Sequence, residues 1–386
     1  MIHSVEPVRY DRSVHRSFST DVRDRVMAYV RAQPNGRFGT PYMAVKVVTL
    51  LVVHWVLYGL LVSTVWSLPV TLLLLATYAF SVMSVAYTVS HDAVHGALSR
   101  RHWVNEALFQ LTFNLFGPSA YLWRYRHKIM HHNCVNIPGA DFNIEASDLL
   151  RFSPTQTWRP AHRYQHLYAP LLYMLFTTQW VFVKDFRMLT IRRIGNVTEI
   201  EHPWVRVAEV VAWKVVYLAL AFGVPYVSLG VGLGPILAGY LFYQAIVSFL
   251  FVLTFTGSHL NRGLVFVPPR SDDGVVPHGF YEHALRTSLD FHPTNPVLSF
   301  VMGGFNAHVA HHMFPQLCSV HYPAITPIIA QTAAEHGLPY HTMTLGELFI
   351  THFRYLYDLG RGPHEPDADY LLGPEPHPTT DGAASR

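Results

Sequence analysis

The chain has 386 residues, of which 50% are hydrophobic, 14% are aromatic and only 14% are charged. Soluble proteins carry about 25% charged residues, so this composition indicates an integral membrane protein. The formal net charge of +3 is too small to predict a nucleic-acid partner, and the two cysteines, Cys134 and Cys318, are too few for a disulfide framework.

The N-terminal part of the chain predicts a tail followed by a membrane hairpin. Residues 1–40 contain seven arginines and no long apolar run, which favours a cytoplasmic tail over a secretory signal peptide. Two apolar stretches follow at about residues 47–65 and 69–89, and each is close to the ~20 residues that span a bilayer as a helix. The connector between them carries no charge, which is typical of a non-cytoplasmic turn.

A second hairpin is predicted further along the chain, with spans at about residues 207–227 and 236–257 and another uncharged connector. Glu209 and Lys214 lie near the start of the third span, where their charged ends can reach the interface. The apolar runs at 103–116 and 168–182 are too short to cross and predict helices that lie on the membrane surface. Residues 41–361 then form one membrane domain, and the tail 362–386, rich in Pro, Asp and Gly, is predicted to be disordered.

Three short histidine clusters lie beside these predicted spans. They contain His91 and His95, then His127, His131 and His132, and finally His308, His311 and His312. Because a whole hairpin separates the middle cluster from the last one, the positive-inside rule places all three on the cytoplasmic face. We therefore expect an all-α, multi-pass membrane protein with a cytoplasmic helical cap, in which the histidines can meet and both termini are cytoplasmic.

The spacing within the clusters predicts a metal site. Residues four apart on a helix lie on one face, so His91 and His95 can address one centre or two neighbouring ones. His127 and His131 would share a face, with His132 turned about 100° away from it. Eight histidines exceed what a four-ligand structural zinc site needs, which favours a dinuclear site. Imidazole suits Fe, Zn, Cu and Ni, so ligand type alone does not choose the metal.

Other interpretations of these histidines have different signatures. The chain contains 25 histidines, so a single pair at helical spacing would be weak support for a metal site. A membrane cytochrome would place its haem ligands within facing spans, whereas these clusters lie outside the spans. A metal transporter or sensor would carry ionisable residues along an interior path, whereas here they gather at the span ends. Cys134 and Cys318 adjoin two of the clusters, as thiolate ligands or as small apolar filler.

Four segments together resemble a known family. They are HDAVH at 91–95, HHNCVNIPGAD at 131–141, GGFNAHVAHHMFP at 303–315 and HYPAI at 321–325. The chain resembles the membrane fatty acid desaturases from about Phe18 to His341, and is most similar to the bacterial linoleoyl-CoA desaturase-like, front-end branch. The third cluster departs from that branch, because His308 and Ala310 stand where glutamine and glutamate are usual.

The resemblance implies an oxidoreductase that uses two iron ions, O2 and two electrons to desaturate an acyl chain carried on CoA, acyl carrier protein or lipid. The eight clustered histidines would be ligands, joined by a ninth: His259, just past the fourth span, or alternatively His283. Asp92 and Asp141 would accept hydrogen bonds from ligating histidines or act as ordinary capping carboxylates. Asn136 and Asn306 would orient a metal-bound water or form turns.

The resemblance also implies partners. We find no His-Pro-Gly-Gly haem signature, so an external electron donor is expected, either ferredoxin or a cytochrome b5-like protein. Basic side chains would bind that donor or the acyl carrier, or only mark the cytoplasmic side; they are Arg124, Arg126, Lys128, Arg192 and Arg193. Tyr121, Trp123, Trp180 and Phe305 are expected at an acyl tunnel, at the interface or in the core. Related diiron sites also act as hydroxylases, epoxygenases or acetylenases, and the ligand set alone does not separate these alternative activities from desaturation.

Overall fold

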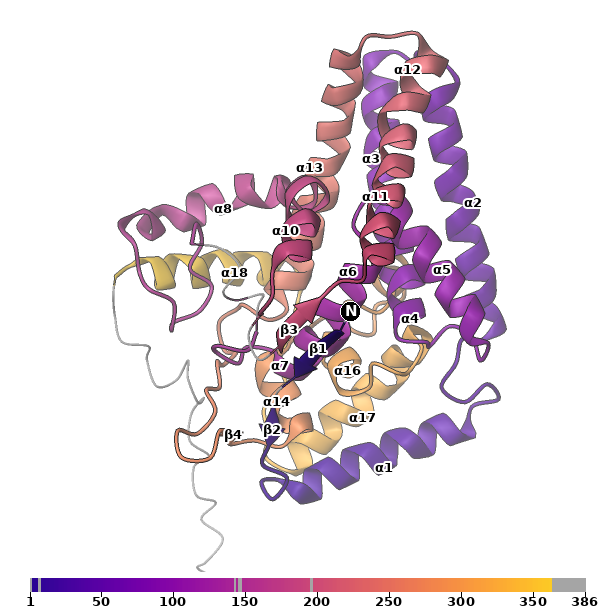
Figure 1. Ribbon diagram of the computed structural model, residues 1–386. Helices are drawn as coiled ribbons and strands as arrows, with labels where there is room; N and C mark the ends of the chain where they lie inside the picture. The colour runs from indigo at the N-terminus through magenta and orange to yellow at the C-terminus, as the bar shows by residue number, and fades with distance from the viewer. Residues whose placement is uncertain (1, 6–7, 142–143, 145–147, 195–196, 363–386) are drawn as a thin grey trace, which may run out of the picture.

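The computed structural model describes residues 2–5, 8–141, 144, 148–194 and 197–362 (Figure 1). Four long helices are apolar enough to cross a membrane. They are α2 (Pro41–Ser63); α3 (Leu68–Val85), continued by the π-helical turn η1 (Ala86–Ser90) and α4 (His91–Val94); α11 (Trp204–Leu218), continued by η5 (Ala219–Gly223) and α12 (Val224–Leu229); and α13 (Leu233–Gly257). The prediction of an all-α fold with four spans is confirmed.

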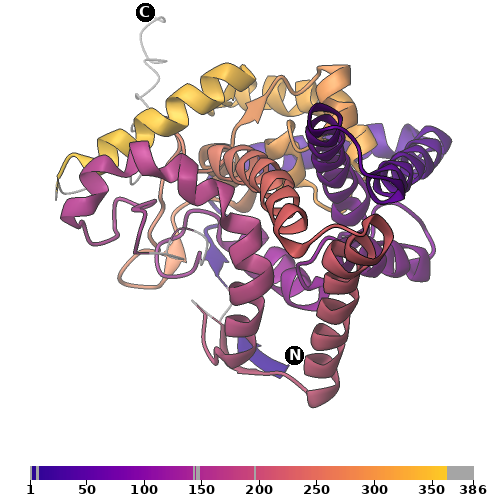
Figure 2. The same cartoon turned by 90° about the horizontal axis from the view of Figure 1, so that it is seen from above.

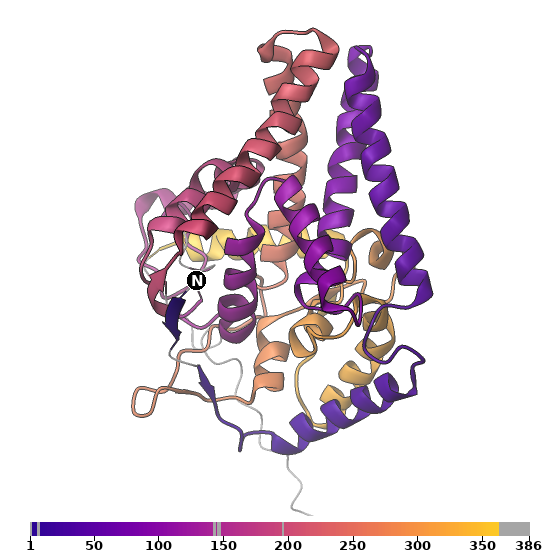
Figure 3. The same cartoon turned by 45° about the vertical axis from the view of Figure 1, so that its right-hand side comes forward.

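The spans form two hairpins whose turns lie at the same end of the molecule (Figures 1 and 3). Thr40 begins the first hairpin, since its side chain accepts a hydrogen bond from the backbone N–H of Met43 and Pro41 follows at the first helical position. In the second hairpin, Gly230 ends α12 with a left-handed backbone (φ 64°), a conformation that glycine adopts without steric cost. The opposite ends of the spans enter the cap.

The observed spans differ from the expected ones near their ends, because two lysine side chains are buried there and donate hydrogen bonds to other parts of the chain. Helix α2 already begins at Pro41 and includes Lys46, whose Nζ donates to the carbonyl oxygen of Ser299 (3.2 Å). Lys214 does not reach toward the interface: its ammonium group is buried and donates to Asp185 Oδ2 and to the Gly117 carbonyl oxygen, both at 2.6 Å. A hydropathy pattern cannot anticipate such pairing, because each partner is distant in sequence.

The cap consists of shorter helices and three strand pairs. Its helices are α1 (Arg16–Ala32), α5 (His102–Leu115), α6 (Ala120–Tyr125), η2 (Arg126–His131), α7 (His132–Cys134), η3 (Pro160–Tyr164), α8 (Gln165–Met174), α9 (Phe176–Gln179), η4 (Trp180–Lys184), α10 (Asp185–Thr190), α14 (Phe280–Thr287), α15 (Pro296–Val301), α16 (His308–Met313), η6 (Ser319–His321), α17 (Tyr322–Glu335) and α18 (Leu345–Gly360). Strand β1 (Ile2–Val5) pairs antiparallel with β3 (Val197–Glu201). Strands β2 (Arg9–Tyr10) and β4 (Val275–Val276) pair in parallel, as do β5 (Asp290–Phe291) and β6 (Thr342–Met343).

Helix α1 belongs to the cap core. Phe18, Val22, Val26 and Val30 recur every four residues, so one face of the helix is apolar. That face packs in one cluster with residues of α14, α16 and α17, and α1 and α17 run along the bottom of the molecule in Figure 1. The segment expected as an N-terminal tail therefore supports the third histidine cluster.

The two short apolar runs are helices outside the spans. Helix α5 covers the first run, and α8, α9 and η4 cover the second. Helices α8 and α18 extend to one side of the spans when the molecule is seen from above (Figure 2). Leu167 and Leu171 on α8 are 66% and 63% exposed, which suits a helix that lies on the membrane surface. Of the predicted disordered tail 362–386, all but Gly362 lies outside the described residues.

Candidate metal centre

Nine histidines gather in two groups where the spans enter the cap. The first group is His91, His95, His127, His132 and His311, and the second is His131, His259, His308 and His312. Within each group, one ring nitrogen from every histidine lies within 4.8 Å of the others. The groups adjoin each other, since the ring centroids of His132 and His312 are 4.7 Å apart. The structure thus brings together all eight clustered histidines and His259.

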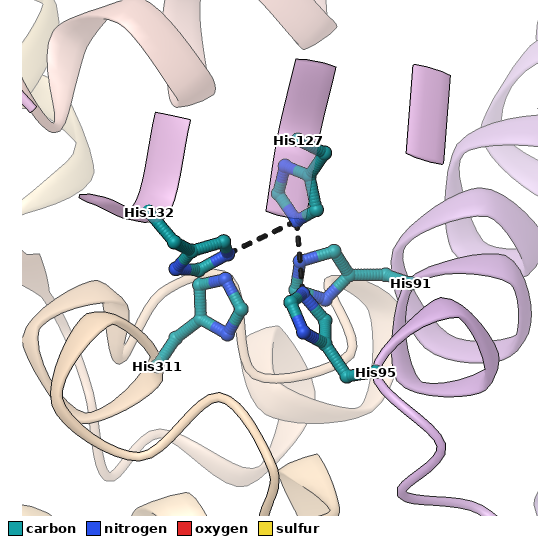
Figure 4. A group of neighbouring side chains, drawn as sticks. All are labelled: His91, His95, His127, His132 and His311. Carbon is teal, nitrogen blue, oxygen red and sulfur yellow. Dashed lines mark hydrogen bonds between the residues drawn. The ribbon is translucent and has the colours of Figure 1, made fainter. Parts of the chain in front are cut away.

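Different parts of the fold supply the histidines. His91 and His95 lie at the inner end of the second span, and the middle cluster lies in η2 and α7. Helix α16 carries the last cluster, and His259 follows the end of α13. Figure 4 shows the five rings of the first group converging from three directions on one space.

The three histidines of the middle cluster are divided between the two groups in a way that α-helical spacing does not predict. His127 was predicted to share a face with His131, yet it groups with His132, and His131 joins the second group. The reason is local: residues Arg126–His131 form a π-helical turn, whose hydrogen bonds run from residue i to i+5. This wider turn changes which side chains align.

The spacing of the nitrogens fits one metal ion in each group. In the first group, His127 Nε2 lies 2.9 Å from His95 Nε2 and 3.2 Å from His132 Nε2. In the second, His308 Nε2 lies 2.8 Å from His259 Nε2 and 3.2 Å from His312 Nε2. Metal–imidazole bonds of about 2.0–2.1 Å at right angles would separate adjacent ligand nitrogens by about 3 Å. Both ring nitrogens of His91 and Nε2 of His311 are buried without a hydrogen-bond partner among the described residues, as metal-directed atoms would be.

Burial keeps these imidazoles in the form that binds metal. It lowers the pKa of His95, His127, His131, His132, His308, His311 and His312 well below the usual value, and the neighbouring histidines add to this effect. Burial also lowers the pKa of His259 to about 4. The rings are therefore neutral near pH 7, with lone pairs available to a cation.

Two outer contacts orient the rings. His311 Nδ1 lies 3.2 Å from the hydroxyl oxygen of Tyr322, and His259 Nδ1 lies 2.9 Å from the carbonyl oxygen of Thr287. Such contacts fix the tautomer and leave Nε2 free for a metal. Sequence reasoning missed both partners. Tyr322 stands in the HYPAI segment, but a tyrosine among apolar residues carries no sign of this contact, and a backbone carbonyl carries none at all.

The other polar candidates lie around the groups. The Asp92 carboxylate accepts hydrogen bonds from the backbone N–H and hydroxyl of Ser319 and from the Cys318 thiol. Asp141 Oδ2 accepts the backbone N–H of Asn136, and the Asn136 amide in turn donates to the His259 carbonyl oxygen (2.8 Å).

Two further candidates lie outside both groups. The amide of Asn306 donates to the carbonyl oxygen of His292 and to the hydroxyl of Ser299. His283 Nε2 lies 2.7 Å from the Val135 carbonyl oxygen, and the ring belongs to neither histidine group. Between His259 and His283, the structure places only His259 beside the clustered histidines.

The cysteines pack as buried filler. Neither Cys134 nor Cys318 belongs to a histidine group. Burial raises the pKa of Cys134 to about 12 and that of Cys318 well above the usual value, so both remain thiols.

Aromatic rings separate the histidines from an apolar cavity between the hairpins. This cavity has a volume of about 640 Å³ and is lined by Phe113, Trp180 and Phe251, among other span and cap residues. Trp123 stacks on His127 and on Phe113, with ring centroids 4.4 Å apart in both pairs. The ring centroid of Phe305 lies 4.7 Å from that of His91 and 5.3 Å from that of His308. Tyr121 is further away, with its hydroxyl 3.1 Å from His202 Nδ1.

The fold and the site together define a multi-pass membrane protein in which two histidine groups that could hold metal lie next to the aromatic rings that border an apolar cavity. The profile of the fatty acid desaturase family matches residues 63–344. Similar proteins include an sn-1 linoleoyl-lipid 6-desaturase of Arthrospira platensis, 31% identical over 88% of this chain and 91% of the relative. One of the same description from Synechocystis sp. is 28% identical over 90% and 96%. An acyl-lipid (8-3)-desaturase of Physcomitrium patens is 27% identical over 92% and 74%.

The chain therefore belongs to the fatty acid desaturase family. The resemblance inferred from the histidine clusters is confirmed, and so is the expectation that the protein is an oxidoreductase.

Proposed function

We propose that this protein introduces a double bond into an acyl chain carried on a membrane lipid, using O2 and an external electron donor. The reaction is R–CH2–CH2–R′ + O2 + 2 e− + 2 H+ → R–CH=CH–R′ + 2 H2O. The observation that carries the proposal is the pair of adjacent histidine groups beside an apolar cavity, in a chain of the desaturase family. The nine grouped histidines would hold two iron ions, and the bound irons would supply the O2 activation that an unactivated CH2 group requires.

The residues of the chain itself would position the substrate. The apolar cavity suits the methyl side of an acyl chain, because most of its lining residues are aliphatic or aromatic. Trp123, between the cavity residue Phe113 and His127, would guide the chain toward the histidines. The buried rings exclude water around the reacting carbons.

A lipid carrier is favoured by the similar proteins described above, which are linoleoyl-lipid and acyl-lipid desaturases. A carrier already in the bilayer could place its acyl chain between the hairpins without leaving the membrane. The alternative carriers are CoA and acyl carrier protein, and the experiment below compares the lipid carrier with both. The electron donor would be ferredoxin or a cytochrome b5-like protein.

The test is to purify the full chain with iron, measure the metal content, and supply reductant and O2 with each of the three carriers. We expect about two irons per chain and a product lighter than the substrate by two hydrogens. His131→Ala and His311→Ala, one from each group, should each lower the metal content and abolish activity. His166→Ala, which lies outside both groups, is the matched control. Activity in both group variants with unchanged metal content would overturn the proposal.

The alternative activities differ in product mass. A hydroxylase or epoxygenase would add one oxygen to its substrate, whereas an acetylenase would remove two hydrogens from a chain that already holds a double bond. Mass spectrometry of the product from a saturated and from an unsaturated chain therefore separates the three outcomes.

A further inference from the structure

A second cavity opens beside the first histidine group. It has a volume of about 320 Å³ and lies between the loop before α2, the turn after α4, the start of α5, and the segment formed by α6 and η2. His95 lines this cavity. Of the nine grouped histidines, His95 alone is partly exposed, whereas the other eight are buried. The cavity is thus an opening from the surface to the first group.

The lining of this cavity is strongly basic, and we call it the basic pocket. Its cationic residues are Arg37, Arg100, Arg124 and Lys128. Glu106 is the acidic residue among those that line it, and its carboxylate is engaged by Arg124 at 2.7 Å. The pair of Glu106 and Arg124 is neutral together. The pocket therefore has a net positive charge, which comes from Arg37, Arg100 and Lys128. Arg100 and Lys128 are both exposed, so their charged groups are available to a ligand.

The basic pocket and the apolar cavity lie on opposite sides of the same ring stack. His95 Nε2, at the pocket, is 2.9 Å from His127 Nε2. His127 stacks on Trp123, and Trp123 stacks on Phe113, which lines the apolar cavity. One end of this arrangement therefore suits an anion, the other suits hydrocarbon, and the histidines lie between them.

We propose that the basic pocket binds the phosphate of the acyl carrier and so fixes the carboxyl end of the acyl chain beside the first histidine group. This inference rests on the proposed function and adds the carrier chemistry to it. Arginine and lysine are the side chains that bind phosphate, through charge-assisted hydrogen bonds. With the carboxyl end held at His95, the position of the new double bond is counted from that end. A phospholipid headgroup and a soluble phosphate-bearing carrier share this chemistry.

An acidic electron-donor protein is the competing ligand. The shape of the site favours the phosphate, because a concave pocket of about 320 Å³ admits a small anionic group and not the face of a folded protein. The two ligands also predict different kinetics: loss of a phosphate contact raises KM for the acyl substrate, whereas loss of a donor contact raises KM for the reduced donor.

The experiment compares Arg100→Gln and Lys128→Gln with the matched control Arg101→Gln, an exposed arginine next in sequence that does not line the pocket. The iron-loaded full chain is assayed in lipid nanodiscs with an acyl phospholipid, an uncharged acyl galactolipid and acyl-CoA, and glycerol 3-phosphate binding is measured by calorimetry. For each pocket variant we expect KM for a phosphate-bearing substrate, relative to KM for the galactolipid, to rise about tenfold. Glycerol 3-phosphate should bind about tenfold more weakly, and Arg101→Gln should change neither value.

The outcomes separate the two proposals. Whichever phosphate-bearing substrate shows the rise, phospholipid or acyl-CoA, identifies the carrier. Unchanged KM ratios and unchanged glycerol 3-phosphate binding in an active enzyme would overturn the pocket proposal alone, as would a rise confined to KM for the electron donor. Glycerol 3-phosphate binding that depends on Arg100 and Lys128, in a protein that desaturates none of the substrates, would instead overturn the proposed function and leave only phosphate binding at the pocket standing.

Discussion

Tyr322 is the side chain whose hydroxyl holds the outer nitrogen of a grouped histidine, and this contact gives the first prediction. Replacing it in Tyr322→Phe removes the 3.2 Å contact to His311 Nδ1 and leaves the ring packing in place. Loss of such an outer contact lowers metal affinity or activity by about 10- to 100-fold. We expect faster loss of metal to a chelator and a lower kcat, measured on the same preparation.

The control for this substitution is Tyr29→Phe. The Tyr29 hydroxyl also approaches a histidine, at 3.4 Å from His321 Nδ1, but His321 belongs to neither group. Equal rates of metal loss in the two variants would show that the Tyr322 hydroxyl does not orient a ligand.

The second prediction concerns the histidine that completes the second group. His259 lies within it, 2.8 Å from His308, whereas His283 Nε2 contacts the Val135 carbonyl oxygen. We expect His259→Ala to lower the iron content of the purified protein and to abolish turnover. His283→Ala should keep both irons and lose stability only, because it leaves a buried carbonyl without its partner. Iron analysis and thermal denaturation on both variants check this, and the reverse pattern would assign His283 as the ligand.

At the residue scale, the sequence predicts which histidines gather but not how they divide. The eight clustered positions followed from their spacing and from the span count, which places them on one face of the membrane. The grouping of His127 with His132 was not predicted, because a π-helical turn replaces the expected α-helix there. Contacts such as that of His311 with Tyr322 arise only when the chain is folded, so no local pattern contains them.

The turn that precedes α16 gives a prediction at the element scale. Gly303 has a positive φ of 54°, and a Cβ atom there would lie 2.6 Å from the carbonyl oxygen of Tyr87. Because the backbone of the second span cannot yield, Gly303→Ala should displace the third histidine cluster. The left-handed conformation costs about 1–2 kcal/mol, and the overlap adds about 1–3 kcal/mol. We expect a lower Tm together with loss of iron.

Gly337→Ala separates conformation from contact. Gly337 also has a positive φ, of 68°, but no atom lies within 4 Å of its Cβ position. We expect only the conformational cost there, with normal iron content. Equal effects on iron binding at the two glycines would argue against close packing of the turn on the second span.

The buried ion pair between α10 and the third span gives the fourth prediction. Lys214→Met leaves the Asp185 carboxylate buried beside the Ser119 N–H and the Trp180 indole, without its cation. Breaking such a pair from one side costs about 3–5 kcal/mol. Asp185→Asn combined with Lys214→Met removes both charges and should recover most of the lost stability. Thermal unfolding in detergent measures both effects, and a double variant no more stable than Lys214→Met would contradict this account.

At the element scale, hydropathy predicts the spans well and their ends poorly. Four apolar runs of near-bilayer length were enough to predict two hairpins. The early start of α2 and the buried Lys214 depend on partners at Ser299 and Asp185, which lie far away in sequence. The cap helices were less visible, because α1 presents only one apolar face among many arginines.

At the scale of the whole molecule, segments from both ends of the chain close around the histidines. Helix α1, before the first span, and helices α14, α16 and α17, after the fourth, share one core cluster. The third histidine cluster is therefore held between an N-terminal helix and a C-terminal one. This closure explains how the third cluster, which a whole membrane hairpin separates from the other two, meets them in one site.

The same arrangement requires that the cap and both hairpin turns lie on opposite sides of the membrane, and we propose that the cap is cytoplasmic. Ser67 lies in the first hairpin turn and Ser271 in the cap, and both are exposed. Cys134 and Cys318 are buried, so cysteines introduced at the two serines would be the accessible thiols among the described residues. We expect a membrane-impermeant maleimide to label Ser67→Cys in intact cells and Ser271→Cys only after lysis. The opposite pattern would place the metal site, and the electron donor that serves it, outside the cytoplasm. It would also show that the positively charged residues do not orient the spans in the way the positive-inside rule predicts.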